Sequence, residues 1–228
     1  MAVTLGNYTF DPAHTAVRET HQEVGGRRER VVEINGVIVG ASTPAAIEAT
    51  LDAILSASAS DAYTAALSLR EGRQLFVRRT DFERHVSPDA LTGAFVLKLR
   101  ARDPHEESIA VATVNWTVQA SGSTLPLATE GTAPAPLTIS LYAVGDVVSP
   151  AFDDGERSIA YNGIVPDGST LIFDAVTQRV TLDGDDVTPY TQGLFPCVDP
   201  AGAALRYTDA AASSHHANVT VAYRDRWW

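Results

Sequence analysis

The sequence predicts a mainly-β protein with two domains. Most apolar residues of the 228-residue chain fall in short runs separated by glycine, proline and aspartate turns, which is typical of strands. One segment alone has the periodicity of an amphipathic helix. A stretch rich in serine, glycine, threonine and proline, SGSTLPLATEGTAPAP, lies between Ala120 and Pro136 and indicates a domain crossing.

These signals set the expected domain limits. We predict a first domain over residues 1–122, a linker over 123–136 and a second domain over 137–228. The apolar fraction of 45% and the charged fraction of 20% are those of an ordinary globular protein. A chain of this length can therefore bury a hydrophobic core in each half.

The expected helix covers residues 44–57. A hydroxyl in Ser42-Thr43 can cap its first turn, and proline suits the next position. Apolar residues then recur on one helical face. They are Ile47, Leu51, Ile54 and Leu55.

Turn signals predict where the strands of the first domain reverse. Asn35-Gly36, which follows Val31, Val32 and Ile34 and precedes the apolar residues 37–39, predicts a two-residue hairpin. Glu71-Gly72 predicts a second hairpin, joining strands at 65–69 and 74–78. Further along, residues 93–102 read as a half-exposed strand. Residues 108–119 alternate cleanly between apolar and polar, so this strand has one dry face and one wet face.

The second half contains only strand patterns. They cover residues 137–144, 170–173, 179–182, 204–207 and 218–223, with a hairpin turn around Thr177. Short strands with turn residues between them predict a sandwich or a compressed barrel.

The charge distribution argues against several partners. The net charge of −11 makes the protein a poor candidate for non-specific binding of nucleic acid or anionic membranes. No run approaches the eighteen apolar residues of a membrane helix, and residues 1–10 lack a secretion signal, so we expect synthesis in a cytoplasm. The first half is nevertheless rich in arginine, which suits either an acidic neighbour or an ordinary charged surface. The arginines are Arg27, Arg28, Arg30, Arg70, Arg73, Arg78, Arg79 and Arg84.

A search for catalytic and metal-binding motifs gives nothing specific. The chain lacks a nucleophile elbow, a zinc-protease motif, a phosphate-binding loop and a dinucleotide fingerprint. The one cysteine, Cys197, has apolar neighbours, so we expect a packed and inert thiol. His215 and His216 form the one histidine cluster. Adjacent residues of a strand point to opposite faces, so such a pair cannot easily bind one metal ion, and we expect the two histidines in a solvated loop that leads into the last strand. We therefore expect no catalytic residue, no metal and no cofactor.

Two other patterns have plain interpretations. The acidic groups at 153–156 and 183–186 lack the ligand spacing of a calcium loop and read first as turns. Asn7, Asn115 and Asn218 each begin an N-x-Thr sequon, which we attribute to β-rich composition.

The last hundred residues contain four ordered segments. They are GTAPAPLTISLYAVGDVVSP with Gly131 to Pro134, GSTLIFDAVTQRVTLDGDDVT with Asp174, GLFPCVDPAGAALRYT with Phe195-Pro196 and Gly202, and ANVTVAYRDRWW with Tyr223 to Trp227. In this order the segments resemble the C-terminal domain of siphophage distal tail proteins, although Pro200-Ala201-Gly202 departs from the asparagine-bearing turn common in that family.

The first half resembles the same family more loosely. VVEINGVIVGASTPAAIEATLDAILSA is similar to a hairpin-then-helix region shared by distal tail proteins and tail-tube subunits. The resemblance implies an N-terminal split β-barrel with one packed helix and a C-terminal galectin-like β-sandwich.

The resemblance also implies a function. Such a protein is a structural component of the virion, assembled in the bacterial host cytoplasm, and it forms a homo-oligomeric ring, hexameric in the family. The ring joins the tail tube protein to the tail-tip hub or baseplate around a passage for DNA, without sequence-specific nucleic-acid binding or membrane insertion. Whether the particle is an infectious phage, a gene transfer agent or a bacteriocin-like tail stays open.

An interface of such a ring would use charged and aromatic residues. Trp227 and Trp228 at the end of the chain suit either an interface or packing against their own domain. The residues that we expect at interfaces are Arg27, Arg28, Arg30, Arg78, Arg79, Trp227 and Trp228.

Two alternatives belong to other functional classes, and a third belongs to the same structural class. A lectin-like module for host attachment could stack sugar rings on Tyr142, Tyr161, Tyr190 or Trp228. A small hydrolase with dispersed carboxylates is a weaker alternative, because no nucleophile and base are placed together. A tail-tube subunit fits the first half, but the second domain argues for a position at the tail tip.

Overall fold

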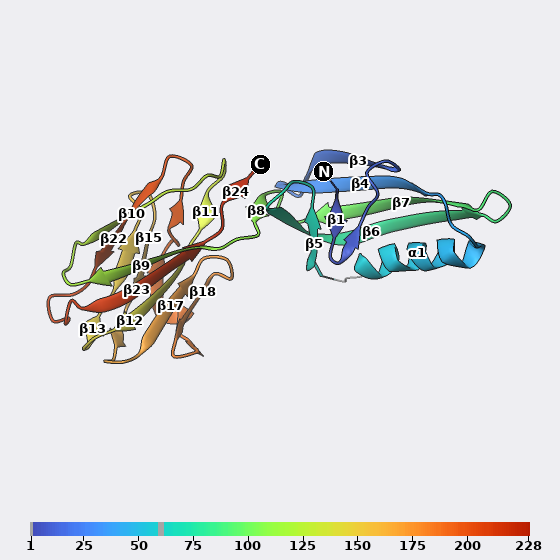
Figure 1. Cartoon of the computed structure of the whole chain (residues 1–228). Coiled ribbons are helices and arrows are strands. Elements are labelled where there is room, and N and C mark those ends of the chain that lie inside the picture. Colours follow the sequence, from blue (N-terminus) through green and yellow to red (C-terminus); the bar gives the residue numbers. More distant parts are fainter. Residues whose placement is uncertain (1, 59–61) are drawn as a thin grey trace. The chain divides into compact units, whose positions relative to one another are not determined.

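The computed structural model describes residues 2–58 and 62–228 of the chain (Figure 1). It consists of two compact units. The first comprises Met1–Ile109 together with Trp228, and the second comprises Ala110–Trp227. Strands dominate both units, and the described residues contain one α-helix, as the sequence predicts.

The N-terminal unit is built on one antiparallel sheet in the order β2-β1-β5-β6-β7-β4-β3, with β8 also paired to β6. Its strands are β1 (Thr4–Leu5), β2 (Tyr8–Thr9), β3 (Thr15–Val24), β4 (Arg27–Ile38), β5 (Ala65–Ser68), β6 (Arg73–Ser87), β7 (Thr92–Ala101) and β8 (Glu106–Ser108). Among the described strands, β2 and β3 end this path without pairing to each other. The sheet is therefore open, as the expected split barrel requires.

Helix α1 (Pro44–Ala57) covers one face of this sheet, as Figure 1 shows. Thr43 caps it by accepting a hydrogen bond from the Ala46 amide at 3.2 Å, so the predicted cap and helix limits are confirmed. Ile47, Leu51 and Ile54 are fully buried against the sheet. No helix in residues 2–58 and 62–228 is long and apolar enough to cross a membrane.

The predicted hairpin at Asn35-Gly36 is wrong. Strand β4 runs straight through this dipeptide and pairs with β3 on one side and β7 on the other. Gly36 lies opposite Phe95, and the Phe95 ring occupies the space that a side chain at position 36 would need. A Cβ on Gly36 would lie 2.3 Å from Phe95 Cζ. The hairpin forms instead at Gly25-Gly26, where both residues have positive φ angles.

The C-terminal unit is a β-sandwich. One sheet has the order β19-β18-β17-β12-β23-β9 and the other the order β10-β22-β14-β15-β20. The first contains β9 (Ala112–Val118), β12 (Thr138–Ala143), β17 (Thr170–Asp174), β18 (Arg179–Leu182), β19 (Asp185–Asp186) and β23 (Ala217–Tyr223). The second contains β10 (Thr124–Leu127), β14 (Ala151–Asp153), β15 (Ser158–Tyr161), β20 (Thr191–Gly193) and β22 (Ala203–Thr208).

Short elements complete this unit. They are β11 (Ala135–Pro136), β13 (Val147–Val148), β16 (Ile164–Val165), β21 (Cys197–Val198), β24 (Arg226–Trp227) and the 3-10 turn η1 (Thr188–Tyr190). β11 pairs with β21, and β13 pairs with β16. The predicted hairpin around Thr177 is confirmed by the pairing of β17 with β18.

Alternating residues of the two sheets form the sandwich core. Phe152, Phe173 and Tyr207 are fully buried, and the Phe152 ring lies 5.6 Å from each of the other two rings, centroid to centroid. Trp116 packs edge-on to Tyr207 from β9. The predicted dry face of the strand at 108–119 is therefore confirmed for β9.

The division of the chain differs from the predicted one. It falls between Ile109 and Ala110, so β9 belongs to the second unit, where it pairs residue by residue with β23. The expected linker over 123–136 contains β10 and β11, which pair with β22 and β21. Its loop-like composition reflects short edge strands of a sandwich, because glycine and proline are tolerated there.

Candidate functional site

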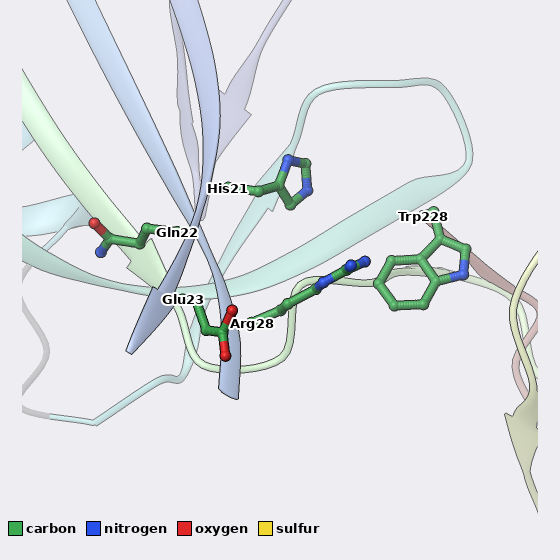
Figure 2. A pocket seen from close by; sticks show the side chains of 5 residues that line it. All are labelled: His21, Gln22, Glu23, Arg28 and Trp228. Atoms are coloured by element: carbon green, nitrogen blue, oxygen red, sulfur yellow. The ribbon is translucent and has the colours of Figure 1, made fainter. Parts of the chain in front are cut away.

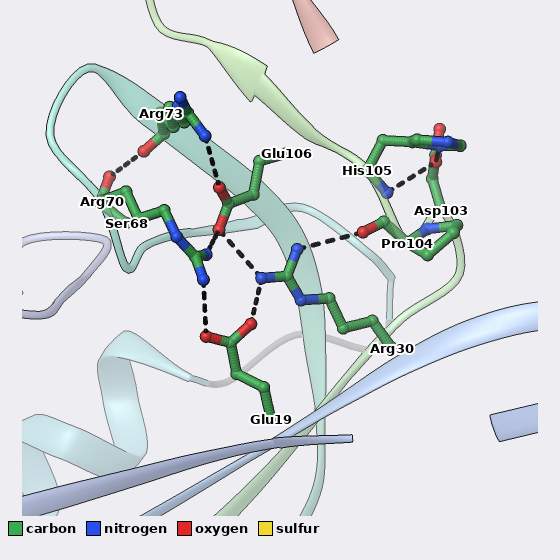
Figure 3. Close-up of polar contacts among 9 residues, drawn as sticks. All are labelled: Glu19, Arg30, Ser68, Arg70, Arg73, Asp103, Pro104, His105 and Glu106. Atoms are coloured by element: carbon green, nitrogen blue, oxygen red, sulfur yellow. Dashed lines mark hydrogen bonds and ion pairs between the residues drawn. The ribbon is translucent and has the colours of Figure 1, made fainter. Parts of the chain in front are cut away.

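A buried cluster of charges joins four segments of the N-terminal unit (Figure 3). Arg30 on β4 and Glu106 on β8 are each 2% exposed, and they form an ion pair of 3.0 Å. Arg30 also pairs with Glu19 on β3 and donates to the Pro104 carbonyl at 3.2 Å. Arg70, before β6, bridges Glu19 and Glu106.

The paired charges of this cluster suit it to hold strands together. Each buried charge has an opposite charge beside it, as burial of ionised groups requires. Burial acts to lower the pKa of Arg70, but the charges of Glu106 and Glu19 outweigh it and raise the pKa above its usual value. The cluster therefore fixes β3 and β8 to the sheet, and it engages Arg30, one of the arginines expected at an interface.

A cavity of about 650 Å³ lies beside the tip of the β3–β4 hairpin (Figure 2). Four of its lining residues carry a polar or charged group, and the fifth is a tryptophan. The lining residues are His21, Gln22, Glu23, Arg28 and Trp228. The Arg28 guanidinium lies 5.9 Å from the centre of the Trp228 ring, in the range of a cation–π contact.

Trp228 itself is 55% exposed. Its ring also lies 4.0 Å from that of His105, centroid to centroid. It is counted with the N-terminal unit, whereas Trp227 belongs to the C-terminal unit and donates its indole N–H to the Glu130 carbonyl at 3.3 Å. The two terminal tryptophans therefore have different environments.

The remaining predicted arginines lie on β6, apart from Arg27, whose side chain is outside the described part of the chain. Arg78 lies over the Tyr63 ring at 5.0 Å. Arg79 donates to the Leu55 carbonyl at 3.0 Å and to Ser58 Oγ at 3.3 Å, so it caps the C-terminal end of α1. Arg28, another of the arginines expected at an interface, lines the cavity described above.

Cys197 is held in a polar corner of the sandwich. Its backbone N–H donates to Asp154 at 2.9 Å, and Arg157 pairs with the same carboxylate at 3.1 Å. Burial raises the pKa of the thiol to about 12 in spite of the nearby arginine. As predicted, this is a packed and unreactive cysteine.

The acidic groups serve as turn anchors. Asp153, Asp183 and Asp186 each accept a backbone N–H, from Gly155, Thr170 and Thr188 respectively. Among the described residues, no three histidine, cysteine, aspartate or glutamate side chains are grouped to hold a metal ion.

His215 corrects the expectation of a solvated pair. Its Nδ1 lies 2.7 Å from Asp209, whose side chain is fully buried. Tyr207 also donates its hydroxyl to Asp209 at 2.8 Å. This cluster anchors the loop before β23. The sequence could not reveal it, because an aspartate between strands is equally typical of an exposed turn.

The tyrosines considered for sugar stacking differ in exposure. Tyr142 and Tyr190 are 45% and 62% exposed. Tyr161 is 7% exposed and is part of the core, so it cannot stack on a ligand. Burial follows from its inward position on β15.

Comparison with known proteins identifies the architecture. No protein-family model matches the chain, and no curated protein matches it. The crystal structure of the phage protein SPP1 Dit (gp 19.1) matches with a TM-score of 0.71, over 100% of this chain and 99% of that chain. The chain has the fold of SPP1 Dit.

The agreement in fold is not matched by agreement in sequence, since the identity is 11%. SPP1 Dit is described as a paradigm of the hub adsorption apparatus in phages that infect Gram-positive bacteria. The resemblance inferred from the C-terminal segments is thus confirmed at the level of fold. The Dit fold accounts for both units, because the match extends over the whole chain.

Proposed function

We propose that this protein is a structural component of a phage or phage-like tail, a distal tail protein that forms a ring at the tail tip. The observation that carries the proposal is the full-length fold match to SPP1 Dit. Both units are matched together, which favours a distal tail protein over a tail-tube subunit or an isolated lectin domain. Fold alone does not assign function, so the proposal needs a test of assembly.

The open N-terminal sheet provides a means of assembly. Its end strand β3 is ten residues long, and its one strand partner in the described part of the chain is β4. An exposed edge of this length is a template for pairing with another chain. Copies arranged head to tail around a closed ring cover such an edge through a heterologous contact.

We further propose the partners that the family resemblance implies. The ring, of six copies, joins the tail tube protein to the tail-tip hub or baseplate and surrounds a passage for DNA. An acidic protein with net charge −11 does not bind DNA non-specifically, which suits a passage. Its role is geometric and involves no catalytic step.

The mass and shape of the purified protein test this proposal. Light scattering and negative-stain microscopy should show a ring with an open centre. Thr20→Lys, on the edge strand β3, should weaken the ring because an edge lysine opposes strand pairing. Val37→Lys is the control: Val37 is an exposed residue of the interior strand β4.

Either of two results would contradict the proposal. One is a monomer that also fails to form rings with co-expressed tail-tube and tail-tip proteins. The other is equal loss of the ring in both lysine variants, which would remove β3 as the assembly edge.

A lectin-like role in host attachment is the second candidate. It is favoured by the exposed ring of Trp228 beside Arg28, His21, Gln22 and Glu23, since sugars bind to aromatic rings flanked by polar groups. Binding to a glycan array that is lost in Trp228→Ala and kept in Tyr190→Ala would support it. Absence of binding to every glycan would exclude it as the main role.

A further inference from the structure

The sandwich of the C-terminal unit has four edge strands, and three of them are built to resist pairing. β19 consists of two aspartates, Asp185–Asp186. β10 contains Pro126, and β20 is three residues long. Charge, proline and short length are the usual means by which proteins protect sheet edges.

The fourth edge, β9, has none of these protections. It is seven residues long, Ala112–Val118, and its sequence ATVNWTV contains no charge, proline or glycine. Its one strand partner among the described residues is β23. Thr113, Asn115 and Thr117 are exposed on its outer face. A long, uncharged edge is a template for another strand.

The outer face of β9 already forms a specific pairing with β23. The register sets Asn115 opposite Thr220 and Thr117 opposite Asn218. Thr220 Oγ1 donates to Asn115 Oδ1 at 3.0 Å, and Thr117 Oγ1 donates to Asn218 Oδ1 at 3.4 Å. Two N-x-T segments therefore meet antiparallel, and each asparagine accepts from the threonine of the other strand.

An N-x-T segment is also complementary to itself. If two copies of β9 pair antiparallel around Trp116, Asn115 of one copy lies opposite Thr117 of the other, and the reverse holds as well. The pairing that β9 forms with β23 is then repeated on its open side. The two Trp116 side chains, on the inner face, become cross-strand neighbours, a favourable aromatic pair.

We propose that β9 is a self-pairing edge, to which a second copy of this chain adds its own β9 antiparallel in the register centred on Trp116. The two six-stranded sheets become one continuous sheet. The contact is isologous, so it cannot join neighbours in a ring whose copies all face the same way. It joins two free chains or two rings, and it does not depend on the ring proposed above.

Two matched lysine variants test the proposal in the full-length chain. Asn115→Lys and Asn218→Lys each remove one cross-strand hydrogen bond on the same face, but only Asn115 lies on the edge strand. Light scattering should give the wild type and Asn218→Lys twice the mass of Asn115→Lys. This factor of two is expected whether the smaller species is a single chain or a ring.

Cross-linking tests the register. Asn115→Cys protein mixed with Thr117→Cys protein should form mixed dimers with a short bismaleimide faster than either protein forms dimers alone. Cys197 is a poor competitor because it is buried and its pKa is raised.

Three results would overturn the proposal. The first is equal mass for wild type and Asn115→Lys across the accessible concentrations. The second is the same loss of mass in both lysine variants, which would assign the contact to the sheet face instead of the edge. The third is the absence of preferential cross-linking between the two cysteine proteins.

Discussion

Arg30 and Glu106 form a buried ion pair across 76 residues of sequence, with each side chain 2% exposed and their charged atoms 3.0 Å apart. The pair connects β4 to β8, two strands that do not pair directly. Glu19 and Arg70 complete the cluster. Removing one partner of a buried ion pair destabilises a protein by more than the intact pair stabilises it, because the other charge stays buried.

Glu106→Gln should therefore destabilise the N-terminal unit strongly. We expect a loss of about 2–3 kcal/mol in the free energy of unfolding, since Arg30 keeps its charge but loses its fully buried partner and is left with the partly exposed Glu19. Urea unfolding followed by fluorescence measures the change. Glu83→Gln is the control, because Glu83 is 66% exposed and its loss should cost below about 0.5 kcal/mol. Equal effects of the two variants would show that the buried pair has no special role.

Gly36→Ala should be destabilising in spite of its small size. The new Cβ would lie 2.3 Å from Phe95 Cζ, so the ring must move out of a packed site, at a cost of about 1–3 kcal/mol. Phe95→Leu shortens the opposing side chain and should relieve part of the overlap. A double-mutant cycle measures this coupling, and strictly additive losses would contradict the proposed ring-over-glycine packing.

Arg79 and Arg84 both contact α1, but they should differ in importance. Arg79 donates to the Leu55 carbonyl at the helix end, whereas Arg84 pairs with Asp52, which is 64% exposed. We expect Arg79→Met to cost about 1–2 kcal/mol and Arg84→Met below about 0.5 kcal/mol. Thermal unfolding of the two variants checks the order, and a larger effect of Arg84→Met would reverse our assignment of the cap.

Asp209 should make the C-terminal unit sensitive to acid. Burial acts to raise the pKa of this carboxyl, but hydrogen bonds from Ser213, Tyr207 and His215 outweigh it and hold the pKa below its usual value. A lowered folded-state pKa gives stability that is present above the unfolded pKa of about 4 and is lost as the pH falls through the folded value.

Asp209→Asn should test this dependence. At pH 7 it should cost about 1–3 kcal/mol, through loss of a buried, charge-assisted hydrogen-bond acceptor. The difference from the wild type should shrink as the pH falls below about 4, where the carboxyl of the unfolded chain becomes protonated first, and it should be lost once the pH is below the lower folded-state pKa. Denaturation at several pH values measures it, with the exposed Asp185→Asn as control. A difference that is constant with pH would contradict the charge-based explanation.

The sequence by itself determined the elements whose signals are local. The helix over 44–57 was predictable because its cap, its proline and its buried face lie within fifteen residues of one another. The hairpin of β17 and β18 was predictable for the same reason. The dry and wet faces of β9 follow from strict alternation, which burial of one sheet face imposes.

Only the tertiary structure decided the features that depend on distant residues. Asn35-Gly36 stays within a strand because Phe95, sixty residues away in sequence, fills the space above Gly36. Glu106 is buried because arginines from other segments neutralise it. β9 joins the second unit because β23, a hundred residues later, supplies its hydrogen bonds and opposes each asparagine with a threonine. These contacts join residues that are far apart in the sequence, so local composition and periodicity cannot predict them.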